Sequence, residues 1–197
     1  MTEQEEHSAA QVSVDATLIR AAQIQEHAHA RGRFEVECRD KHGKLKWLDT
    51  IENVTTDVGV RLALDTFLAG SGYTVVGPFV GLISSVGYGA GPVAGDTMAS
   101  HAGWTEAGLA NAPTYTAPRK TAAWAAASGR SKALSAALAF VFTGGGTVKG
   151  CFLVYGTGAV STIDNTSGTL YSAGLFTGGD KVVVSTDTLN VTYTASM

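Results

Sequence analysis

Charge is scarce in this chain. Only 16% of its 197 residues are charged, against about 25% in an average soluble domain. A surface with so little charge is typical of a protein that contacts other proteins over much of its area. The formal net charge is −3, which gives no general attraction to nucleic-acid phosphates. We therefore expect protein partners and no direct nucleic-acid binding.

Cysteines and long apolar runs are also scarce. Cys38 and Cys151 are the two cysteines, and their spacing fits no metal site, which predicts two free, half-buried thiols in a reducing compartment. No run of 18 apolar residues is present, so we expect no membrane span. The first six residues include three glutamates, where a secretory signal would be basic. These features predict a protein that is made in the cytoplasm and has no membrane partner.

The sequence lacks a recognisable catalytic constellation. His101 is the one histidine close to candidate partners, which are Ser100, Asp96 and Glu106. Adjacent side chains on an extended segment point apart, and no nucleophile elbow of the Gly-x-Ser-x-Gly type surrounds Ser100. A histidine hydrogen-bonded in a packed loop beside Trp104 explains this pattern better than a catalytic triad does.

Metal binding and glycoside cleavage have equally little support. His7, His27 and His29 lie on a polar segment without a fixed carboxylate or thiolate that would complete a metal site. Glycoside cleavage needs paired carboxylates, and acidic residues are sparse after residue 66: Asp96, Glu106, Asp164, Asp180 and Asp187. We therefore assign no catalytic, cofactor-binding or metal-binding residues, and we expect that the protein is not an enzyme.

Two other groups of residues suggest a function at first sight. Residues 144–147 are three glycines and a threonine, but the lysine of a phosphate-binding loop does not follow them, so they predict a hairpin turn. A modest basic cluster consists of Arg119, Lys120, Arg130 and Lys132. Because the charge density of this cluster is low, we interpret it as a solvated or interface-facing loop.

The clearest local structure is a hairpin near the start of the globular part. Phe34, Val36 and Cys38 alternate with charged residues, as in a half-buried strand. Residues 40–43 have the composition of a turn. Residues 45–51 then alternate again and predict the returning strand.

One helix is predicted at about residues 56–69. Thr55 or Thr56 can cap its N-terminus, Asp57 suits its first turn, and Gly70 can end it. Four apolar residues share one face at helical spacing and are expected to pack on the core: Val60, Leu64, Phe67 and Leu68.

Most of the remaining chain predicts strands. They are expected at residues 78–84, 120–127, 136–143, 148–155, 169–176, 181–185 and 188–194. We expect 136–143 and 148–155 to pair as a second hairpin, and residues 86–112 to form a long loop. About eight short strands separated by turns are typical of a β-sandwich or a jelly roll.

The chain divides into two parts. Residues 1–32 hold no aromatic residue and predict an N-terminal arm that is extended or partly helical, from Asp15 to about Glu26. Such an arm is either disordered or ordered only against a neighbour. Residues 33–197 predict a mainly β domain, which is a jelly-roll-like sandwich with one short helix.

Several blocks of the chain resemble a known family. They are residues 34–40, 45–47, 53–56, 68–74, 80–83, 95–104, 168–174, 176–180 and 187–194. Together they resemble virion structural proteins of tailed bacteriophages, chiefly the short-tailed podophages. The resemblance covers roughly residues 33–196, and residues 98–104 are a comparatively specific block of it.

The resemblance implies a capsid cement, or decoration, protein with a jelly-roll-like fold. Members of this family dimerise, clamp neighbouring major capsid proteins on the outside of the head, and carry no catalytic residues. It therefore implies the major capsid protein as a partner, self-association as a homodimer or a trimer, and a place on the capsid surface of the virion. A tail- or fibre-associated binding module is the alternative, and a virion-borne depolymerase is a weaker third possibility.

Overall fold

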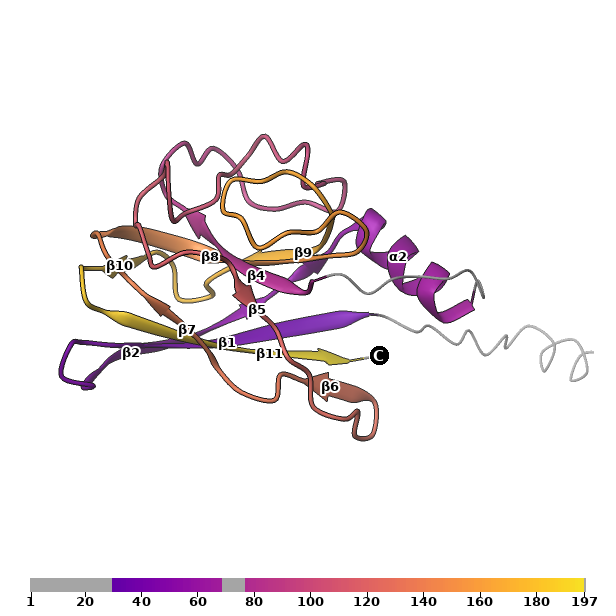
Figure 1. Cartoon of the computed structure of the whole chain (residues 1–197), viewed down its shortest axis with the longest axis horizontal. Helices are drawn as coiled ribbons and strands as arrows, with labels where there is room; N and C mark the ends of the chain where they lie inside the picture. The colour runs from indigo at the N-terminus through magenta and orange to yellow at the C-terminus, as the bar shows by residue number, and fades with distance from the viewer. Residues whose placement is uncertain (1–29, 69–76, 197) are drawn as a thin grey trace, which may run out of the picture.

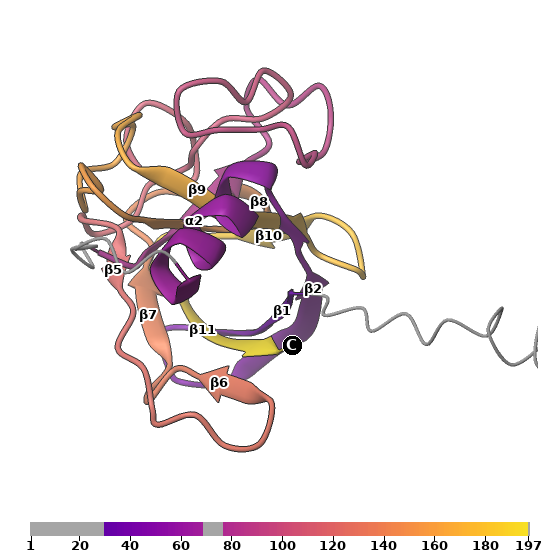
Figure 2. The same cartoon turned by 90° about the vertical axis from the view of Figure 1, so that its right-hand side faces the viewer.

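Over its described residues the protein is mainly β, with two antiparallel sheets and one helix (Figure 1). The structure is a computed structural model, and it describes residues 30–68 and 77–196. The two sheets curve around a common core, as the view along the sandwich shows (Figure 2). This arrangement confirms the predicted β-sandwich with one short helix.

The first sheet contains the two ends of the described chain. Its strands, in spatial order, are β2 (Leu45–Glu52), β1 (Arg31–Arg39), β11 (Thr188–Ser196) and β6 (Ser131–Ala133), and β7 (Leu138–Val141) also pairs with β11. The first and last strands therefore lie side by side, and all nine residues of β1 are paired with β11. Since β1 begins at Arg31, the sheet includes two residues of the segment that the sequence assigned to the arm.

The second sheet is built from the middle of the chain. Its strands are β3 (Val54–Thr55), β9 (Thr169–Leu175), β8 (Gly146–Tyr155), β4 (Phe79–Ser84) and β5 (Lys120–Thr121), and β10 (Lys181–Val183) also pairs with β8. The predicted strand at 120–127 is thus limited to two residues, and the short strands β3 and β6 were not predicted. The jelly-roll connectivity is not confirmed, because β1 and β2 form a hairpin within one sheet and β8 and β9 form another within the other.

The predicted β1–β2 hairpin is confirmed in detail. The Asp40 carboxylate accepts hydrogen bonds from the backbone N–H groups of His42 (2.8 Å) and Lys44 (3.0 Å). Gly43 has a φ of 79°, a left-handed conformation that glycine adopts without a steric penalty. The turn chemistry read from the sequence therefore does set the register of this hairpin.

The predicted second hairpin is wrong. β7 pairs with β11 in the first sheet, whereas β8 pairs with β4, β9 and β10 in the second. The glycines at 144–146 therefore carry the chain from one sheet to the other. They suit this path because a Cβ on Gly146 would lie 2.8 Å from the Pro113 nitrogen, closer than real Cβ atoms come.

The helix α2 (Asp57–Leu68) lies at one end of the sandwich and packs on β9 (Figure 2). Thr56 caps it, because its hydroxyl accepts the Gly59 N–H at 3.0 Å. The predicted core-facing side is wrong: Val60 and Leu64 are 39% and 50% exposed. The side with buried Gly59 faces inward instead, against the Tyr171 backbone. The side chains of Phe67 and Leu68 lie outside the part of the chain that the structure describes. No helix within 30–68 and 77–196 is long and apolar enough to cross a membrane.

The core has two layers. The larger one lies between the sheets and includes the alternating residues predicted from β1, such as Phe34 and Val36, and those from β11, such as Leu189 and Val191. A second apolar cluster lies on the other side of the second sheet. The loops that cover this side are residues 85–119 and 156–168, which we call the loop layer (Figure 1). The long loop predicted at 86–112 falls within it.

Phe140 and Val141 give a direct test of this core. Phe140 is fully buried, whereas its neighbour Val141 is 43% exposed. We expect Phe140→Ala to lower the free energy of unfolding by about 3–5 kcal/mol, because it leaves a cavity between the sheets. Val141→Ala should cost less than about 1 kcal/mol. Urea denaturation measures both values, and equal losses would contradict this placement of the core.

Candidate interaction surface

Along β1 and β11, the side of the first sheet that faces away from the core is polar. We call it the open face. On β11 its side chains are Thr188, Asn190, Thr192, Thr194 and Ser196, and on β1 they are Arg33, Glu35, Glu37 and Arg39. These side chains alternate with buried ones along both strands. The open face therefore offers short hydroxyl and amide groups on one strand and paired charges on the next.

The charges of the open face are largely paired with each other. Arg39 donates two hydrogen bonds to Glu37, at 2.8 and 3.0 Å. These bonds, together with one from Asn190 at 2.9 Å, hold the pKa of Glu37 below its usual value. All three side chains are at least partly exposed, so the pairs add little stability. They do neutralise this part of the surface.

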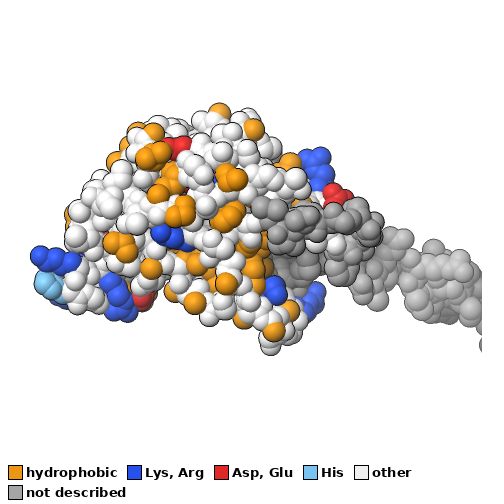
Figure 3. Space-filling model, viewed as in Figure 1, with side chains coloured by type: hydrophobic (Ala, Val, Ile, Leu, Met, Phe, Trp, Pro, Cys, Tyr) orange, Lys and Arg blue, Asp and Glu red, His pale blue; other side chains and the backbone are white. Residues whose placement is uncertain are grey.

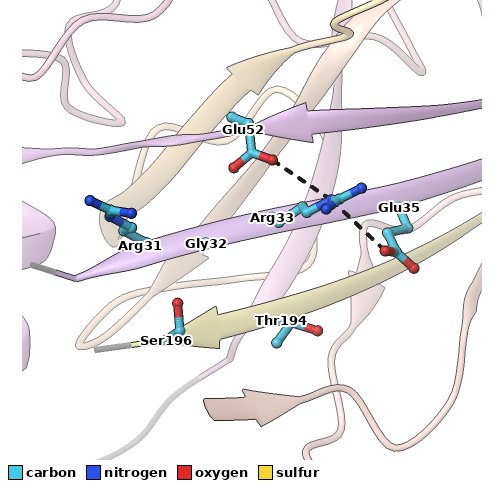
Figure 4. A pocket seen from close by; sticks show the side chains of 7 residues that line it. All are labelled: Arg31, Gly32, Arg33, Glu35, Glu52, Thr194 and Ser196. Atoms are coloured by element: carbon cyan, nitrogen blue, oxygen red, sulfur yellow. Dashed lines mark ion pairs between the residues drawn. The ribbon is translucent and has the colours of Figure 1, made fainter. Parts of the chain in front are cut away.

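A hollow of about 370 Å³ lies at the end of the open face where β1 begins (Figure 4). It is lined by Arg31, Gly32, Arg33, Glu35, Glu52, Thr194 and Ser196. Arg33 lies between Glu35 and Glu52, at 3.8 and 3.7 Å. With exposed ion pairs and no aromatic wall, this hollow suits contact with a protein backbone better than a small molecule.

Apolar side chains are scattered over the face of the molecule that Figure 3 shows. The most exposed large ones are Leu109 (66%), Leu48 (65%), Val182 (65%), Val93 (57%) and Val184 (51%). Leu48 lies on β2 at the edge of the open face. Exposed apolar groups beside a polar sheet are a common composition of protein–protein contacts.

The edge strand β2 is held by a loop of the second sheet. The Thr50 carbonyl accepts the Thr177 N–H at 2.9 Å. The Asp49 carboxylate accepts hydrogen bonds from Thr177 and Gly178, and Lys181 lies 2.6 Å away. Burial alone would raise the pKa of Asp49, but the bonds from its neighbours lower it to about 2. Asp49 thus joins the two sheets at this edge.

The residues weighed as a catalytic triad have other roles. The Asp96 carboxylate accepts the Trp104 indole N–H at 2.9 Å. His101 stacks on the Trp104 ring, with centroids 4.0 Å apart, and its Nδ1 lies 2.9 Å from the Trp104 carbonyl. Glu106 pairs with Arg119. The predicted packing of His101 beside Trp104 is therefore confirmed, and the loop layer does not assemble Ser100, His101 and a carboxylate into a triad.

Arg119 and Glu106 form a buried ion pair within the loop layer. Arg119 Nε and Nη2 donate to the two Glu106 oxygens at 2.8 and 2.6 Å, and both side chains are at most 5% exposed. Arg119 also donates to the carbonyls of Val160 and Asn165, and Glu106 accepts the Asp164 N–H at 2.8 Å. Burial raises the pKa of Glu106, and the Arg119 hydrogen bonds oppose that rise. The pair ties the loop before β5 to the loop after β8.

This ion pair changes the interpretation of the predicted basic cluster. Arg119 is not on a solvated loop, because it is fully buried. Lys120 donates to the Thr116 carbonyl and lies over the Tyr115 ring. Arg130 and Lys132 are exposed, near and within β6. No sequence pattern marks Glu106 and Arg119 as partners, because they lie 13 residues apart in irregular structure.

The histidines weighed as metal ligands all belong to the N-terminal segment. His7, His27 and His29 lie outside the described residues, and no group of three His, Cys, Asp or Glu in the described part is arranged to hold a metal.

Cys38 and Cys151 are free, as predicted, but fully buried rather than half-buried. Burial, and then the nearby Asp187 charge, raises the pKa of Cys38 to about 11, and burial raises the pKa of Cys151. Both thiols are thus part of the core.

The buried ion pair predicts a large asymmetry between two glutamates. Glu106→Gln leaves the Arg119 charge buried without its partner, so we expect a loss of about 3–5 kcal/mol in the free energy of unfolding. Glu52→Gln removes only an exposed pair with Arg33 and should cost less than about 0.5 kcal/mol. Urea denaturation compares the two variants. Similar small losses would show that the pair does not anchor the loop layer.

Asp49 predicts a defined pH dependence of stability. Its folded pKa of about 2 lies below the unfolded value of about 3.9, so its contribution is present above pH ~4 and is lost as the pH falls towards 2. We expect wild type to lose about 2 kcal/mol more than Asp49→Asn over this range. Asp180→Asn, at a half-exposed carboxylate beside Lys149, is the control and should follow wild type. Parallel curves for wild type and Asp49→Asn would contradict the assignment.

Comparison with known proteins gives no match for this chain. No protein-family model, no curated protein and no solved structure matches it. The comparisons therefore neither support nor oppose the resemblance to podophage decoration proteins, and a functional proposal depends on the surface described above.

Proposed function

We propose that this chain is a structural protein of a phage virion, a cement protein that binds the outside of the capsid and stabilises contacts between major capsid proteins. The observation that carries the proposal is the open face, where the hydroxyl and amide side chains of β11 lie beside the mutually paired charges of β1. The resemblance of the sequence blocks to decoration proteins points the same way.

Such a face suits attachment to a folded shell. Short hydroxyl side chains lose little conformational entropy on contact, and charges that are already paired carry little net field. Each contact is then weak, but forming it costs little free energy. Many copies on one shell add their binding free energies. A cement protein needs this kind of binding, because it reinforces a surface that has already assembled.

A tail- or fibre-associated binding module is the second candidate. It is favoured by a smaller hollow of about 180 Å³ in the loop layer, whose lining includes His101, Asp164 and Asn165. Concave sites with a few polar groups beside aromatic side chains are typical of ligand binding. We rank this function second because the pair beneath the hollow, Glu106 and Arg119, is already fully engaged with protein groups.

The proposal predicts saturable binding to heads that lack the protein. In cosedimentation we expect on the order of hundreds of copies per head, since a cement protein follows the repeat of the shell. Thr192→Arg places a long charged side chain at the centre of the open face and should weaken binding at least about tenfold.

Ser167→Arg is the matched control, because Ser167 is exposed on the loop layer and the variant adds the same charge. It should bind as wild type does. Saturation at a dozen copies or fewer would contradict the cement function and favour the tail-associated module. A Thr192→Arg variant that binds normally would exclude the open face as the contact surface.

A further inference from the structure

The turn between β1 and β2 concentrates positive charge at one end of the molecule. Residues 39–46 contain four basic residues and one acidic one: Arg39, Lys41, Lys44, Lys46 and Asp40. Figure 3 shows basic side chains gathered at the end where Figure 1 places this turn. The described residues as a whole are close to neutral, so this concentration is a local feature.

Two of these charges have no partner within the described residues. Arg39 is engaged by Glu37, and Lys46 by Asp187. The Asp40 carboxylate is occupied in the turn, where the N–H groups of His42 and Lys44 lower its pKa. The ammonium groups of Lys41 and Lys44 form no ion pair in the described part of the chain, and both residues are exposed. Leu45, 42% exposed, and Leu48, 65% exposed, lie beside them on β2.

The complementary charge lies in the first 29 residues of the same sequence. This segment contains five acidic residues and one arginine: Glu3, Glu5, Glu6, Asp15, Glu26 and Arg20. Its net charge is −4, whereas residues 30–197 hold thirteen basic and twelve acidic residues, a net charge of +1. The segment also carries the apolar residues Val12, Val14, Leu18 and Ile19, which could cover Leu45 and Leu48.

We propose that the acidic N-terminal segment, residues 1–29, of one copy binds the basic β1–β2 turn of the next copy. The segment joins the sheet at Ala30, and the turn lies at the other end of β1, a strand of nine residues or about 30 Å. The point where the acidic segment meets the sheet and the basic turn thus lie at opposite ends of one molecule. A head-to-tail contact satisfies both ends in every copy and can repeat around a ring or across a surface.

This self-association goes beyond the proposed function, because it involves no capsid protein and can be measured in solution. The full chain is prepared in unlabelled and ¹⁵N-labelled form, mixed in equal amounts, and treated with a carbodiimide that joins carboxylates directly to lysines. We expect cross-linked peptides that join Glu3, Glu5 or Glu6 to Lys41 or Lys44, with one peptide of each isotope. Cross-links confined to one isotope would show that the segment binds its own turn, and cross-links to other lysines would exclude the turn; either result overturns the proposal.

Charge-reversal variants give an independent measurement by sedimentation velocity. The variant K41E/K44E should weaken self-association about tenfold, and so should E3K/E5K/E6K. Combining all five substitutions should restore it. The control R130E/K132E makes the same charge change on exposed residues near β6 and should associate as wild type does.

Three results would contradict the proposal. They are a control that loses as much affinity as K41E/K44E, a combined variant that does not recover, and an association that is unchanged after removal of residues 1–29. Deletion ends at residue 29 because β1 begins at Arg31. Oligomers that disappear on nuclease treatment would show that the turn binds nucleic acid instead, which also overturns the proposal.

Discussion

The buried ion pair between Glu106 and Arg119 is the interaction on which the rest of this molecule depends. Burying two charges is expensive, and the expense is offset only when nearly every donor and acceptor is satisfied. Here Arg119 donates to both Glu106 oxygens and to two backbone carbonyls, and Glu106 accepts a backbone N–H as well. Because these partners come from two long loops, the pair ties the two parts of the loop layer to each other.

The loop layer makes the two sides of the sandwich different. It covers one side of β8, whose residues 150–154 are therefore buried on both faces. The first sheet has no such cover over its described residues, so its polar side remains open. Asp49 then ties the edge of this sheet to the turn before β10. The sandwich therefore has one irregular side and one regular, largely neutral sheet face, which is why we assign partner contact to the latter.

The features that could be predicted from the sequence are those determined by neighbouring residues. The alternation in β1 and β11, the Asp40–Gly43 turn and the Thr56 cap each depend on contacts within a few positions. The errors concern contacts between distant segments. The glycines at 144–146 resemble a hairpin but join two sheets, and α2 turns its Gly59 side inward because that side approaches the Tyr171 backbone closely. Arg119 was placed on a solvated loop because its partner Glu106 has no local signature.

The central claim is that the open face, rather than the loop layer, meets the protein shell. A cryo-EM map of a particle that carries this chain tests that claim most directly, because the two sides of the sandwich differ enough to be told apart. The account predicts density of the major capsid protein against β1 and β11, with the loop layer facing solvent. Density against the loop layer, with β11 facing away from the shell, would contradict it.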